Sequence, residues 1–530
     1  METLRSQLAY EPLELKFGTS GRRGLVADLT QLEIYINALA ELEYLLSLPL
    51  ADGGITRGDD FYFACDLRPS STKYVPAERG RGEIAQAIMR AIQDAGLNPV
   101  YLGRIPTPAL TYHALSRGKG SIMVTGSHIP FDRNGYKLNT SQGELLKQHE
   151  APVNEMVRQR RERLYSGDFS ASLFDATGRF KSGHSELPLA EGGAAGRYLE
   201  RYTGFFAGQS LEGRRIVAYQ HSAVGRDLLV QLLESFGAEV IPAGRSDTFV
   251  PIDTENIDAE QLAAIQSLTD RAAAQYGPVW AVVSTDGDSD RPLILGVEDG
   301  QARFFPGDLV GMIVAEFLAA GAVVVPISCN DAIDRGVLAP VLEPKTRIGS
   351  PFVIAGMELA RSKGRGTVCG WEANGGFLLG SDVERDGRVL RNLPTRDAFL
   401  PIVCVLLAAH QAGGSVGDLF ARLPRRFSRA ALLKNFPRAV SLRILELADF
   451  GEFFRRELGF GNIVGFDRTD GVRMRFANGE IAHIRPSGNA DELRIYAVAD
   501  SQERADEIAA LGVAEPDGIL RAMERAVSAR

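Results

Sequence analysis

One pattern recurs three times along the chain and restricts its fold more than any other feature. A helical stripe of apolar residues ends near a glycine and leads into a short apolar strand. The three copies span residues 83–103, 226–244 and 307–328, with glycines at Gly96, Gly237 and Gly321. A helix, a glycine C-cap and a buried strand make half of a βαβ unit. Successive units of one large sheet would give the same pattern, but polar segments at 140–200 and 422–429 favour three separate α/β domains.

The residues after 430 follow a different pattern. Asp470-Gly471 and Asn478-Gly479 are typical hairpin turns. Alternating apolar and polar residues follow them at 472–476 and 492–499, and the sequence from Ser501 onward predicts helix. We therefore expect a small C-terminal α+β domain with an antiparallel sheet.

Length and charge set further limits. At about 150 residues per domain, a chain of 530 residues has three or four domains. A net charge of −8 argues against a nucleic-acid partner, since such proteins carry basic surfaces. It leaves room for a small anionic substrate, because a few arginines suffice to make a local positive site.

Other features concern the compartment. The four cysteines show no CxxC spacing, which favours a reducing cytoplasm. The first fifteen residues lack the pattern of a signal peptide. The most apolar stretch, 309–327, is interrupted by Glu316, Gly321 and Pro326, so we expect no membrane span and a cytoplasmic protein.

Three carboxylates follow one buried strand. The stretch WAVVSTDGDSDRPLIL (280–295) places Asp286, Asp288 and Asp290 close together, where they repel one another unless a cation binds. An EF-hand loop is excluded, because its glycine and glutamate positions hold Arg291 and Val297. Ligands that are all oxygens favour Mg²⁺ over zinc, although an acidic loop without metal is the alternative.

A serine also stands where a strand ends. In MVTGSHIPFDRNGYKLN (123–139), an apolar run stops at Thr125-Gly126, and Ser127, His128 and then Lys137 follow. A nucleophile needs such a position, exposed to its substrate and held by the strand behind it, although ordinary loops also contain serines.

Three further stretches carry groups that suit a sugar phosphate. In CGWEANGGFLL (369–379), Glu372 and Asn374 can bind two sugar hydroxyls. In HIRPSGNADELRIY (483–496), the side chains of Arg485, Ser487 and Arg494 and the amides of Gly488 and Asn489 can surround a phosphate. In KFGTSGRRGL (16–25), glycines flank Arg22 and Arg23. Each stretch alone is also typical of an exposed turn.

Together these five stretches resemble one family, the α-D-phosphohexomutases, which include phosphomannomutase and phosphoglucomutase. The family's phosphoserine loop usually reads TASHNP, and here it reads TGSHIP. Its metal loop, DGDAD followed by arginine, appears as DGDSDR, and its sugar loop as WEANGG. Its phosphate loop, RPSGT and relatives, appears as RPSGN. The order of the motifs and their spacing also match across nearly all of the chain.

The resemblance implies an α/β fold: three related α/β domains plus a C-terminal α+β domain around a central cleft. The expected bounds are 1–200 with the phosphoserine loop, 201–303 with the metal loop, 304–430 with the sugar loop and 431–530 with the phosphate loop. It also implies a small-molecule sugar phosphate as partner, Mg²⁺ as cofactor and a hexose 1,6-bisphosphate as activator. We expect no nucleic acid or membrane partner, and a monomer or a dimer.

The resemblance also assigns roles to residues. It implies that Ser127 is phosphorylated, that Lys137 and Arg23 lie near the transferring phosphoryl group, and that His128 is placed for proton transfer. The implied metal ligands are a phosphoserine oxygen of Ser127 and Asp286, Asp288 and Asp290. The implied substrate-binding residues are Arg291, which faces the metal or a phosphate, Glu372 and Asn374 at the sugar's 3- and 4-hydroxyls, and Arg485, Ser487, Gly488 and Asn489 at the non-reacting phosphate.

Three positions depart from the family pattern. Ile129 replaces the usual asparagine of the phosphoserine loop, Asn374 a common serine, and Asn489 a common threonine. None of these changes removes a charge or a metal ligand, so the expected activity stands, while the identity of the sugar stays open.

The resemblance implies a mutase that interconverts hexose 1-phosphate and hexose 6-phosphate, with mannose, glucose or both as the sugar, through a phosphoserine and a 1,6-bisphosphate. A phosphoglucosamine or phosphopentose mutase is an alternative within the same chemistry. A serine phosphatase would not need the second phosphate loop. A non-catalytic sugar-phosphate-binding protein is expected to have lost the nucleophile or a ligand, and this chain retains Ser127 and the three aspartates.

Overall fold

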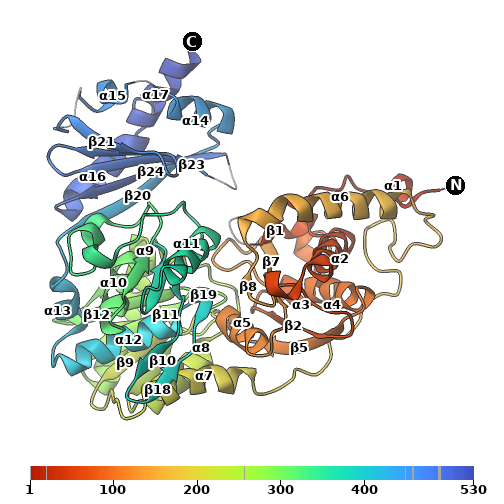
Figure 1. The fold of residues 1–530 in the computed structure, drawn as a ribbon, viewed down its shortest axis with the longest axis horizontal. Helices are drawn as coiled ribbons and strands as arrows, with labels where there is room; N and C mark the ends of the chain where they lie inside the picture. Colours follow the sequence, from red (N-terminus) through yellow and green to blue (C-terminus); the bar gives the residue numbers. More distant parts are fainter. Residues whose placement is uncertain are drawn as a thin grey trace.

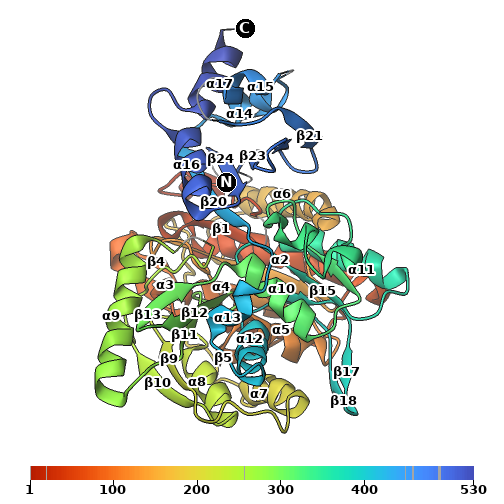
Figure 2. The ribbon, with the colours of Figure 1, turned by 90° about the vertical axis from the view of Figure 1, so that its left-hand side faces the viewer.

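The described part of the chain forms four larger sheets with their helices, and two small two-stranded sheets (Figure 1). The computed structural model describes residues 2–18, 21–255, 257–447, 449–455, 459–487 and 491–529. The N-terminal sheet and its helices lie to one side, the second and third sheets lie next to each other, and the C-terminal sheet lies above them (Figures 1 and 2). None of the described helices has the length and apolar character needed to cross a membrane.

The first sheet is mixed, with the order β1-β7-β6-β2-β5. Its strands are β1 (Arg22–Leu25), β2 (Asp60–Cys65), β5 (Asn98–Arg104), β6 (Ser121–Val124) and β7 (Arg133–Thr140), with β8 (Gly143–Glu144) beside β7. The helices here are α1 (Leu4–Gln7), α2 (Gln31–Ser47), α3 (Pro69–Thr72), α4 (Ile84–Asp94), α5 (Thr107–Leu115) and α6 (Glu150–Ser166), and β3 (Tyr74–Val75) pairs with β4 (Arg81–Gly82). Side chains alternate along β2, so Phe63 joins the core under α2 and α4 while Tyr62 joins the core under α5.

The second and third sheets repeat this mixed arrangement, in the orders β10-β9-β11-β12-β13 and β14-β15-β16-β19. The second contains β9 (Arg215–Tyr219), β10 (Glu239–Ala243), β11 (Ala281–Thr285), β12 (Pro292–Glu298) and β13 (Gln301–Phe304), with α7 (Ala194–Phe205), α8 (Arg226–Ser235) and α9 (Ala259–Tyr276). The third contains β14 (Ala322–Val324), β15 (Val368–Trp371), β16 (Phe377–Leu379) and β19 (Leu393–Asp397), with α10 (Gly307–Phe317), α11 (Ser350–Ser362), α12 (Phe399–Gln411), α13 (Val416–Ala421) and the hairpin of β17 (Val383–Arg385) and β18 (Arg388–Leu390). The three expected helix–strand copies thus lie in three different sheets.

The same topological step recurs in these three sheets. A strand with a parallel neighbour (β6, β11 or β15) is followed by an antiparallel neighbour (β7, β12 or β16). The serine, aspartate and glutamate stretches occupy the connections between these strand pairs. Each stretch therefore begins at the carboxyl end of a buried strand, where α/β sheets bind their ligands.

The C-terminal sheet is antiparallel, with the order β20-β24-β23-β22-β21. Its strands are β20 (Phe427–Lys434), β21 (Ile463–Asp467), β22 (Val472–Phe476), β23 (Ile481–Pro486) and β24 (Glu492–Ala499). Its helices are α14 (Arg438–Leu445), α15 (Gly451–Arg455), α16 (Gln502–Val513) and α17 (Ile519–Ser528). The predicted turns at 470–471 and 478–479 are confirmed as the hairpin connections, and Ser501 caps α16 as its side chain accepts a hydrogen bond from Arg504 N.

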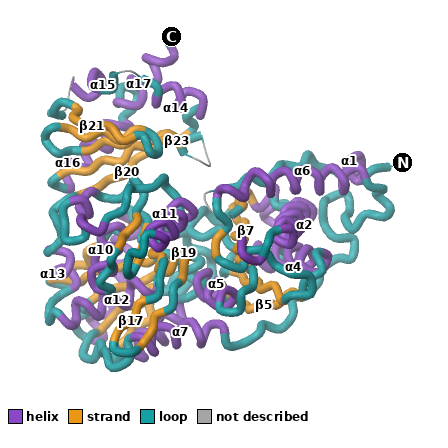
Figure 3. Tube along the Cα trace, in the orientation of Figure 1, coloured by secondary structure: helices purple, strands orange, loops and turns teal. Residues whose placement is uncertain are grey.

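Two details differ from the expectation. The third helix, α10, ends at Phe317, and the left-handed residue after it is Ala319 (φ 52°), so the predicted cap at Gly321 is wrong. Gly321 instead donates its amide to Thr367 O at 2.7 Å, where the chain enters β14. The polar segment 140–200 is not a plain linker, because α6 packs against α2 of the first sheet (Figure 3).

Candidate active site

Ser127 lies in the connection between β6 and β7. It has a left-handed backbone (φ 54°), an uncommon conformation for a residue other than glycine, and its side chain is buried. Its Oγ donates to Asp286 Oδ2 at 2.6 Å and lies 3.3 Å from His128 Nδ1. The serine loop and the aspartate loop also touch through their backbones, because a Cβ at Gly287 would lie 2.6 Å from Ser127 O.

Two residues that follow β2 hold this loop in place. Asp66 Oδ2 accepts from Thr125 Oγ1 at 2.8 Å, and Thr125 Oγ1 in turn accepts from Ser127 N at 2.7 Å. The buried Arg68 guanidinium donates to the carbonyl oxygens of Ser127, Ile129, Pro130 and Arg133. The strained serine is therefore fixed by the neighbouring parallel strand.

Asp286, Asp288 and Asp290 form a buried cluster in the connection between β11 and β12. One oxygen from each carboxylate lies within 4.8 Å of the others. Lys137, on β7, reaches across from the first sheet and pairs through Nζ with Asp288 Oδ2 at 2.6 Å and Asp290 Oδ2 at 2.5 Å. Thr107 Oγ1, at the start of α5, also donates to Asp288 Oδ2.

The three carboxyl groups have different proton affinities. Burial and the charges of Asp288 and Asp290 raise the pKa of Asp286. Burial also disfavours the ionised form of Asp288, but Lys137 outweighs it, and the pKa of Asp288 is lowered. At Asp290 burial is outweighed by Arg396, Lys137 and Arg291, which lower its pKa. Cations from three parts of the chain thus keep two of the three carboxylates ionised.

The donor set fits a hard divalent cation. Asp288 Oδ1 and Asp290 Oδ1 are buried and accept no hydrogen bond from any described residue. A buried carboxylate oxygen without a hydrogen bond is costly, also where an arginine lies at ion-pair distance as at Asp290 Oδ1, and a metal ion would satisfy both oxygens. Since the site offers only oxygen ligands, it suits a metal of the Mg²⁺ type rather than zinc.

Three further predicted residues lie around this cluster. The pKa of Arg23 is lowered to about 10 by burial and by repulsion from Arg291. Arg291 Nε lies 3.7 Å from Asp290 Oδ1. Burial, Arg291 and Arg23 also lower the pKa of His128, which favours its neutral form. Arg23, Arg291 and Lys137 together give this region positive charge, the property required for binding phosphate.

The glutamate of the sugar loop is tied to the aspartate cluster. Arg396, on β19, donates through Nε to Asp290 Oδ2 at 3.0 Å and through Nη1 to Glu372 Oε2 at 3.1 Å. Asn374 Oδ1 accepts from Gly376 N at 2.9 Å within its own turn. Thr254 Oγ1, from the second sheet's loops, donates to Asn374 O at 2.7 Å. The Asn374 side chain thus helps to shape the loop.

The residues predicted to bind the non-reacting phosphate lie on or next to the C-terminal sheet. Arg485 on β23 is the register partner of Arg494 on β24, so the two guanidinium groups start from the same face. Arg485 Nε lies 3.0 Å from Asp470 Oδ1, and Ser487 is buried. Gly488 and Asn489 lie outside the described residues. Among the residues that are described, no hydrogen bond or ion pair joins Arg485 to the serine or aspartate loop.

Glu255 connects the two regions through its electrostatic field. Its pKa is raised to about 7 by burial and by Asp253, while Arg291 and Arg494 oppose the shift. Arg291 follows the aspartate cluster and Arg494 belongs to the C-terminal sheet, so Glu255 is within electrostatic range of both. Arg494 of the C-terminal sheet and Arg291 of the aspartate loop therefore act on the same carboxyl group.

Sequence reasoning found the loops but missed the residues that join them. The missed residues are Asp66, Arg68, Thr107, Thr254, Glu255 and Arg396. Asp66 and Arg68 had a usable signal, because they directly follow an apolar strand in FYFACDLRP. Arg396 had none, since its partners are distant in sequence.

Known proteins share this organisation. Family models described as phosphoglucomutase/phosphomannomutase match residues 14–163 (alpha/beta/alpha domain I), 306–427 (alpha/beta/alpha domain III) and 433–512 (C-terminal domain). The chain is 38% identical to a phosphomannomutase of Salmonella muenchen over 497 residues, which cover 93% of this chain and 94% of that protein.

Solved structures agree on the fold. A putative phosphomannomutase from Thermus thermophilus has a TM-score of 0.66 at 19% identity, covering 98% of this chain and 100% of that one. An N-acetylphosphoglucosamine mutase from Aspergillus fumigatus, in complex with GlcNAc-6P and magnesium, has a TM-score of 0.55 at 15% identity, covering 99% and 98%. From the matching models and the full-length relative together, the chain belongs to the phosphoglucomutase/phosphomannomutase family, the α-D-phosphohexomutases.

Proposed function

We propose that this protein interconverts the 1-phosphate and the 6-phosphate of a hexose, with mannose or glucose as the sugar, through a phosphate carried on Ser127. The observation that carries this proposal is the buried Ser127 Oγ, which lies 2.6 Å from Asp286 Oδ2 at the edge of the aspartate cluster. The name of the Salmonella relative, phosphomannomutase, supports the same activity. Ser127 has the surroundings that a phosphorylated serine needs, since Lys137, Arg23 and Arg291 can neutralise its charge.

The proposed transfer uses the chain's own groups at each step. A hydroxyl oxygen of the bound hexose phosphate forms a bond to the phosphorus on Ser127, and the bond from phosphorus to Ser127 Oγ breaks. The proton of that hydroxyl passes to His128, and His128 returns a proton to the released Ser127 Oγ, 3.3 Å away. The product of this half is a hexose 1,6-bisphosphate, which turns over in the cleft and returns its other phosphate to Ser127.

We assign the metal to Mg²⁺, held by Asp286, Asp288, Asp290 and an oxygen of phospho-Ser127. When bound, Mg²⁺ supplies positive charge that stabilises the phosphoryl oxygens during transfer. Lys137 and Arg23 add cations on the first sheet's side of the phosphoryl group. We also propose that a hexose 1,6-bisphosphate activates the enzyme by restoring the phosphate on Ser127 whenever the intermediate escapes.

The sugar and its remote phosphate need separate binding groups. We propose that Glu372 and the Nδ2 amide of Asn374 bind the 3- and 4-hydroxyls, with Arg396 orienting the Glu372 carboxylate. Arg485 and Ser487, together with Gly488 and Asn489, would bind the phosphate that is not reacting, and Arg291 would contact a phosphate from the other side. These groups allow the sugar to bind in both orientations, because the 3- and 4-hydroxyls roughly exchange places when it turns.

The decisive experiment is Ser127→Ala. Intact mass of the purified parent protein should show the excess of one phosphate, and peptide mapping should place it on Ser127 rather than Ser121 or Ser141. The alanine variant should lose that phosphate and nearly all mutase activity while it still binds a hexose phosphate. Interconversion of mannose 1- and 6-phosphates by Ser127→Ala at close to the parent rate would show that Ser127 is only a loop residue.

The choice of sugar needs a separate assay. A phosphoglucosamine mutase of Granulibacter bethesdensis is 27% identical over 363 residues, covering 67% of this chain and 72% of that protein, so glucosamine must be included. Initial rates on mannose, glucose and glucosamine 1-phosphates, with a trace of bisphosphate, would rank the three. We expect mannose or glucose to rank first. If none of them turns over, a protein that only binds sugar phosphates becomes the better description.

A further inference from the structure

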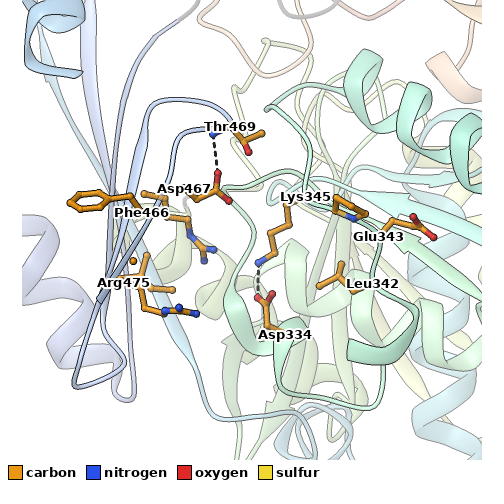
Figure 4. A pocket seen from close by; sticks show the side chains of 12 residues that line it. Asp334, Leu342, Glu343, Lys345, Phe466, Asp467, Thr469 and Arg475 are labelled. Atoms are coloured by element: carbon orange, nitrogen blue, oxygen red, sulfur yellow. Dashed lines mark hydrogen bonds and ion pairs between the residues drawn. The ribbon is translucent and has the colours of Figure 1, made fainter. Parts of the chain in front are cut away.

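One cavity of the described chain lies outside the residues assigned to the reaction. Its volume is about 600 Å³, within the usual range for small-molecule sites, and it lies between the segment after β14 and the C-terminal sheet (Figure 4). Residues 334–345 form one wall, and strands β21, β22 and β23 form the other. None of the residues assigned to the serine, metal, sugar or phosphate groups lines it.

The charged groups of this cavity are not evenly paired. Its cations are Lys345, Arg473 and Arg475, and its carboxylates are Asp334, Glu343 and Asp467. Asp334 pairs with Lys345 at 2.6 Å, and Glu343 is engaged by Lys363 and Arg365, which are not among the lining residues. Asp467 accepts from Thr469 N at 2.9 Å. Within the part of the chain that the structure describes, neither Arg473 nor Arg475 forms an ion pair.

Arg473 carries a guanidinium group that is partly buried without a hydrogen-bond acceptor, which is unfavourable for the folded state. Its Nη2 is buried and donates to no described residue. Burial lowers the pKa of Arg473 although the charges of Asp331, Asp334 and Asp467 oppose the shift, and burial together with the charge of Arg473 lowers the pKa of Lys345 against the charge of Asp334. A buried donor without an acceptor and two cations close enough to repel each other both favour the entry of an anion. Figure 4 shows Arg475 reaching from its strand toward the side where Lys345 and Asp334 lie.

The cavity lies on the same face of the C-terminal sheet as the residues proposed to bind the non-reacting phosphate. Arg473 is the register partner of His483, and His483 is the partner of Tyr496 and stacks on its ring. Arg485 and Arg494 continue the same face two residues further along their strands. This face therefore carries one pair of arginines at the cavity, Arg473 and Arg475, and a second pair, Arg485 and Arg494, further along the strands.

We propose that this cavity binds a small anion of the phosphate class. The anion is held between Arg473 and Arg475 of the C-terminal sheet and Lys345 of the segment that follows β14. Guanidinium groups bind phosphate oxygens through paired, charge-assisted hydrogen bonds, and an ammonium adds a third cation. Because its ligands come from both walls of the cavity, the bound anion holds the C-terminal sheet to the segment that follows β14. Inorganic phosphate and the phosphoryl group of a metabolite share this chemistry.

Equilibrium dialysis with radiolabelled inorganic phosphate tests the proposal on the full chain. One equivalent of glucose 1,6-bisphosphate per chain, with Mg²⁺, occupies the active site and leaves little free bisphosphate to compete at the cavity, so the phosphate that still binds reports on other sites. We expect one phosphate per chain, with affinity reduced roughly tenfold or more in Arg473→Gln, the change expected for one lost charged hydrogen bond. The matched control is Arg429→Gln, an arginine of β20 that is not among the cavity residues, and it should bind like the parent.

Arg475→Gln provides a second variant, because Arg475 is exposed and its loss leaves the core intact. It should also weaken phosphate binding while leaving the basal mutase rate unchanged. A parallel arm with glycerol 3-phosphate as competitor separates the two sources, since the tighter ligand identifies the class. The proposal is wrong if the parent chain binds no phosphate beyond the active site, or if Arg473→Gln and Arg475→Gln, both shown to be folded by circular dichroism, bind phosphate as tightly as the parent.

Discussion

At the scale of single residues, the three aspartates between β11 and β12 have different sets of partners, with Lys137 shared by two of them. Asp286 accepts from Ser127, Asp288 from Thr107 and Lys137, and Asp290 from Lys137 and Arg396. Together the three carboxylates connect this loop to the serine loop, to α5, to β7 and to β19. Substitutions at these positions should separate the effect on the nucleophile from the effect on metal binding.

Asp288→Asn should lower turnover by about a hundredfold or more, because it removes a ligand charge while keeping the side chain's shape. The fold should persist, since Thr107 can still donate to the amide oxygen. Steady-state rates across a Mg²⁺ titration, with circular dichroism, measure both effects. The control is Asp299→Asn, an exposed turn residue at φ 49° where asparagine is tolerated. Near-parent, Mg²⁺-dependent rates in Asp288→Asn would remove the metal assignment.

Glu255 gives a prediction about pH. Its pKa is raised from 4.5 to about 7, so between these values the folded state holds a proton that the unfolded state has lost. The protonated form of Glu255 therefore stabilises the folded state, and this contribution to the free energy of unfolding is lost as the pH rises through about 7. Glu255→Gln cannot ionise, so its stability relative to the parent should be greater at pH 8 than at pH 5.

Urea midpoints of the parent and of Glu255→Gln at pH 5 and pH 8 test this difference. Glu260→Gln, an exposed change in the first turn of α9, serves as the control and should show no such dependence. An equal effect of Glu255→Gln at both pH values would mean that Glu255 titrates normally in the folded protein.

At the scale of elements, the connections matter more than the strands. The serine loop depends on Arg68, whose guanidinium binds several carbonyl oxygens of residues 127–133. A lysine has the same charge but cannot reach these carbonyls together. Arg68→Lys should therefore lower kcat by roughly tenfold to a hundredfold and speed amide exchange in the loop.

Hydrogen exchange followed by mass spectrometry locates the change, and steady-state kinetics gives its effect on kcat and KM. Arg90→Lys, at an exposed position on α4 with an Asp94 ion pair, is the matched control. Unchanged exchange across 126–133 in Arg68→Lys would show that the loop holds its shape without that guanidinium.

The sequence predicted those parts of the site whose signal is local. Ser127 and the three aspartates each follow an apolar strand directly, so strand, loop and side chain appear in one short stretch. Arg396 could not be predicted, because its role arises only when β19 pairs beside β16 and brings it to Glu372 and Asp290. The prediction of a helix cap at Gly321 was wrong because Ala319, two residues earlier, already takes the left-handed conformation after α10.

At the scale of the whole molecule, Arg485, proposed to bind the non-reacting phosphate, and Ser127, the proposed nucleophile, belong to different sheets. Hydrogen bonds within the described chain link the first three sheets at the aspartate cluster. The C-terminal sheet is held differently, through Arg426 to Asp331 and Gly479, and through Ile348 N to Asp470. Since no described hydrogen bond joins this sheet to the aspartate cluster, we expect it to be the part that moves toward a bound substrate.

Binding of a sugar bisphosphate should therefore make the protein more compact, as the C-terminal unit closes over the ligand and excludes water. Small-angle scattering with and without saturating glucose 1,6-bisphosphate should show a smaller radius of gyration. Arg485→Gln should reduce this compaction, because it removes a cation from the moving face. No change for the parent at saturation would count against a closing fourth unit.

The sugar loop has one further consequence, for protein engineering. Residues 372–376 connect β15 to β16, and the Trp371 and Phe377 rings at the two ends stack with centroids 6.0 Å apart. Both ends of the loop are thereby fixed by a pair that does not depend on the residues between them. We expect that the segment can be exchanged as a cassette, with Arg396 and Thr254 as the contacts that any replacement must still satisfy. Under the proposed role of Glu372 and Asn374, such an exchange would change sugar preference without rebuilding the sheet.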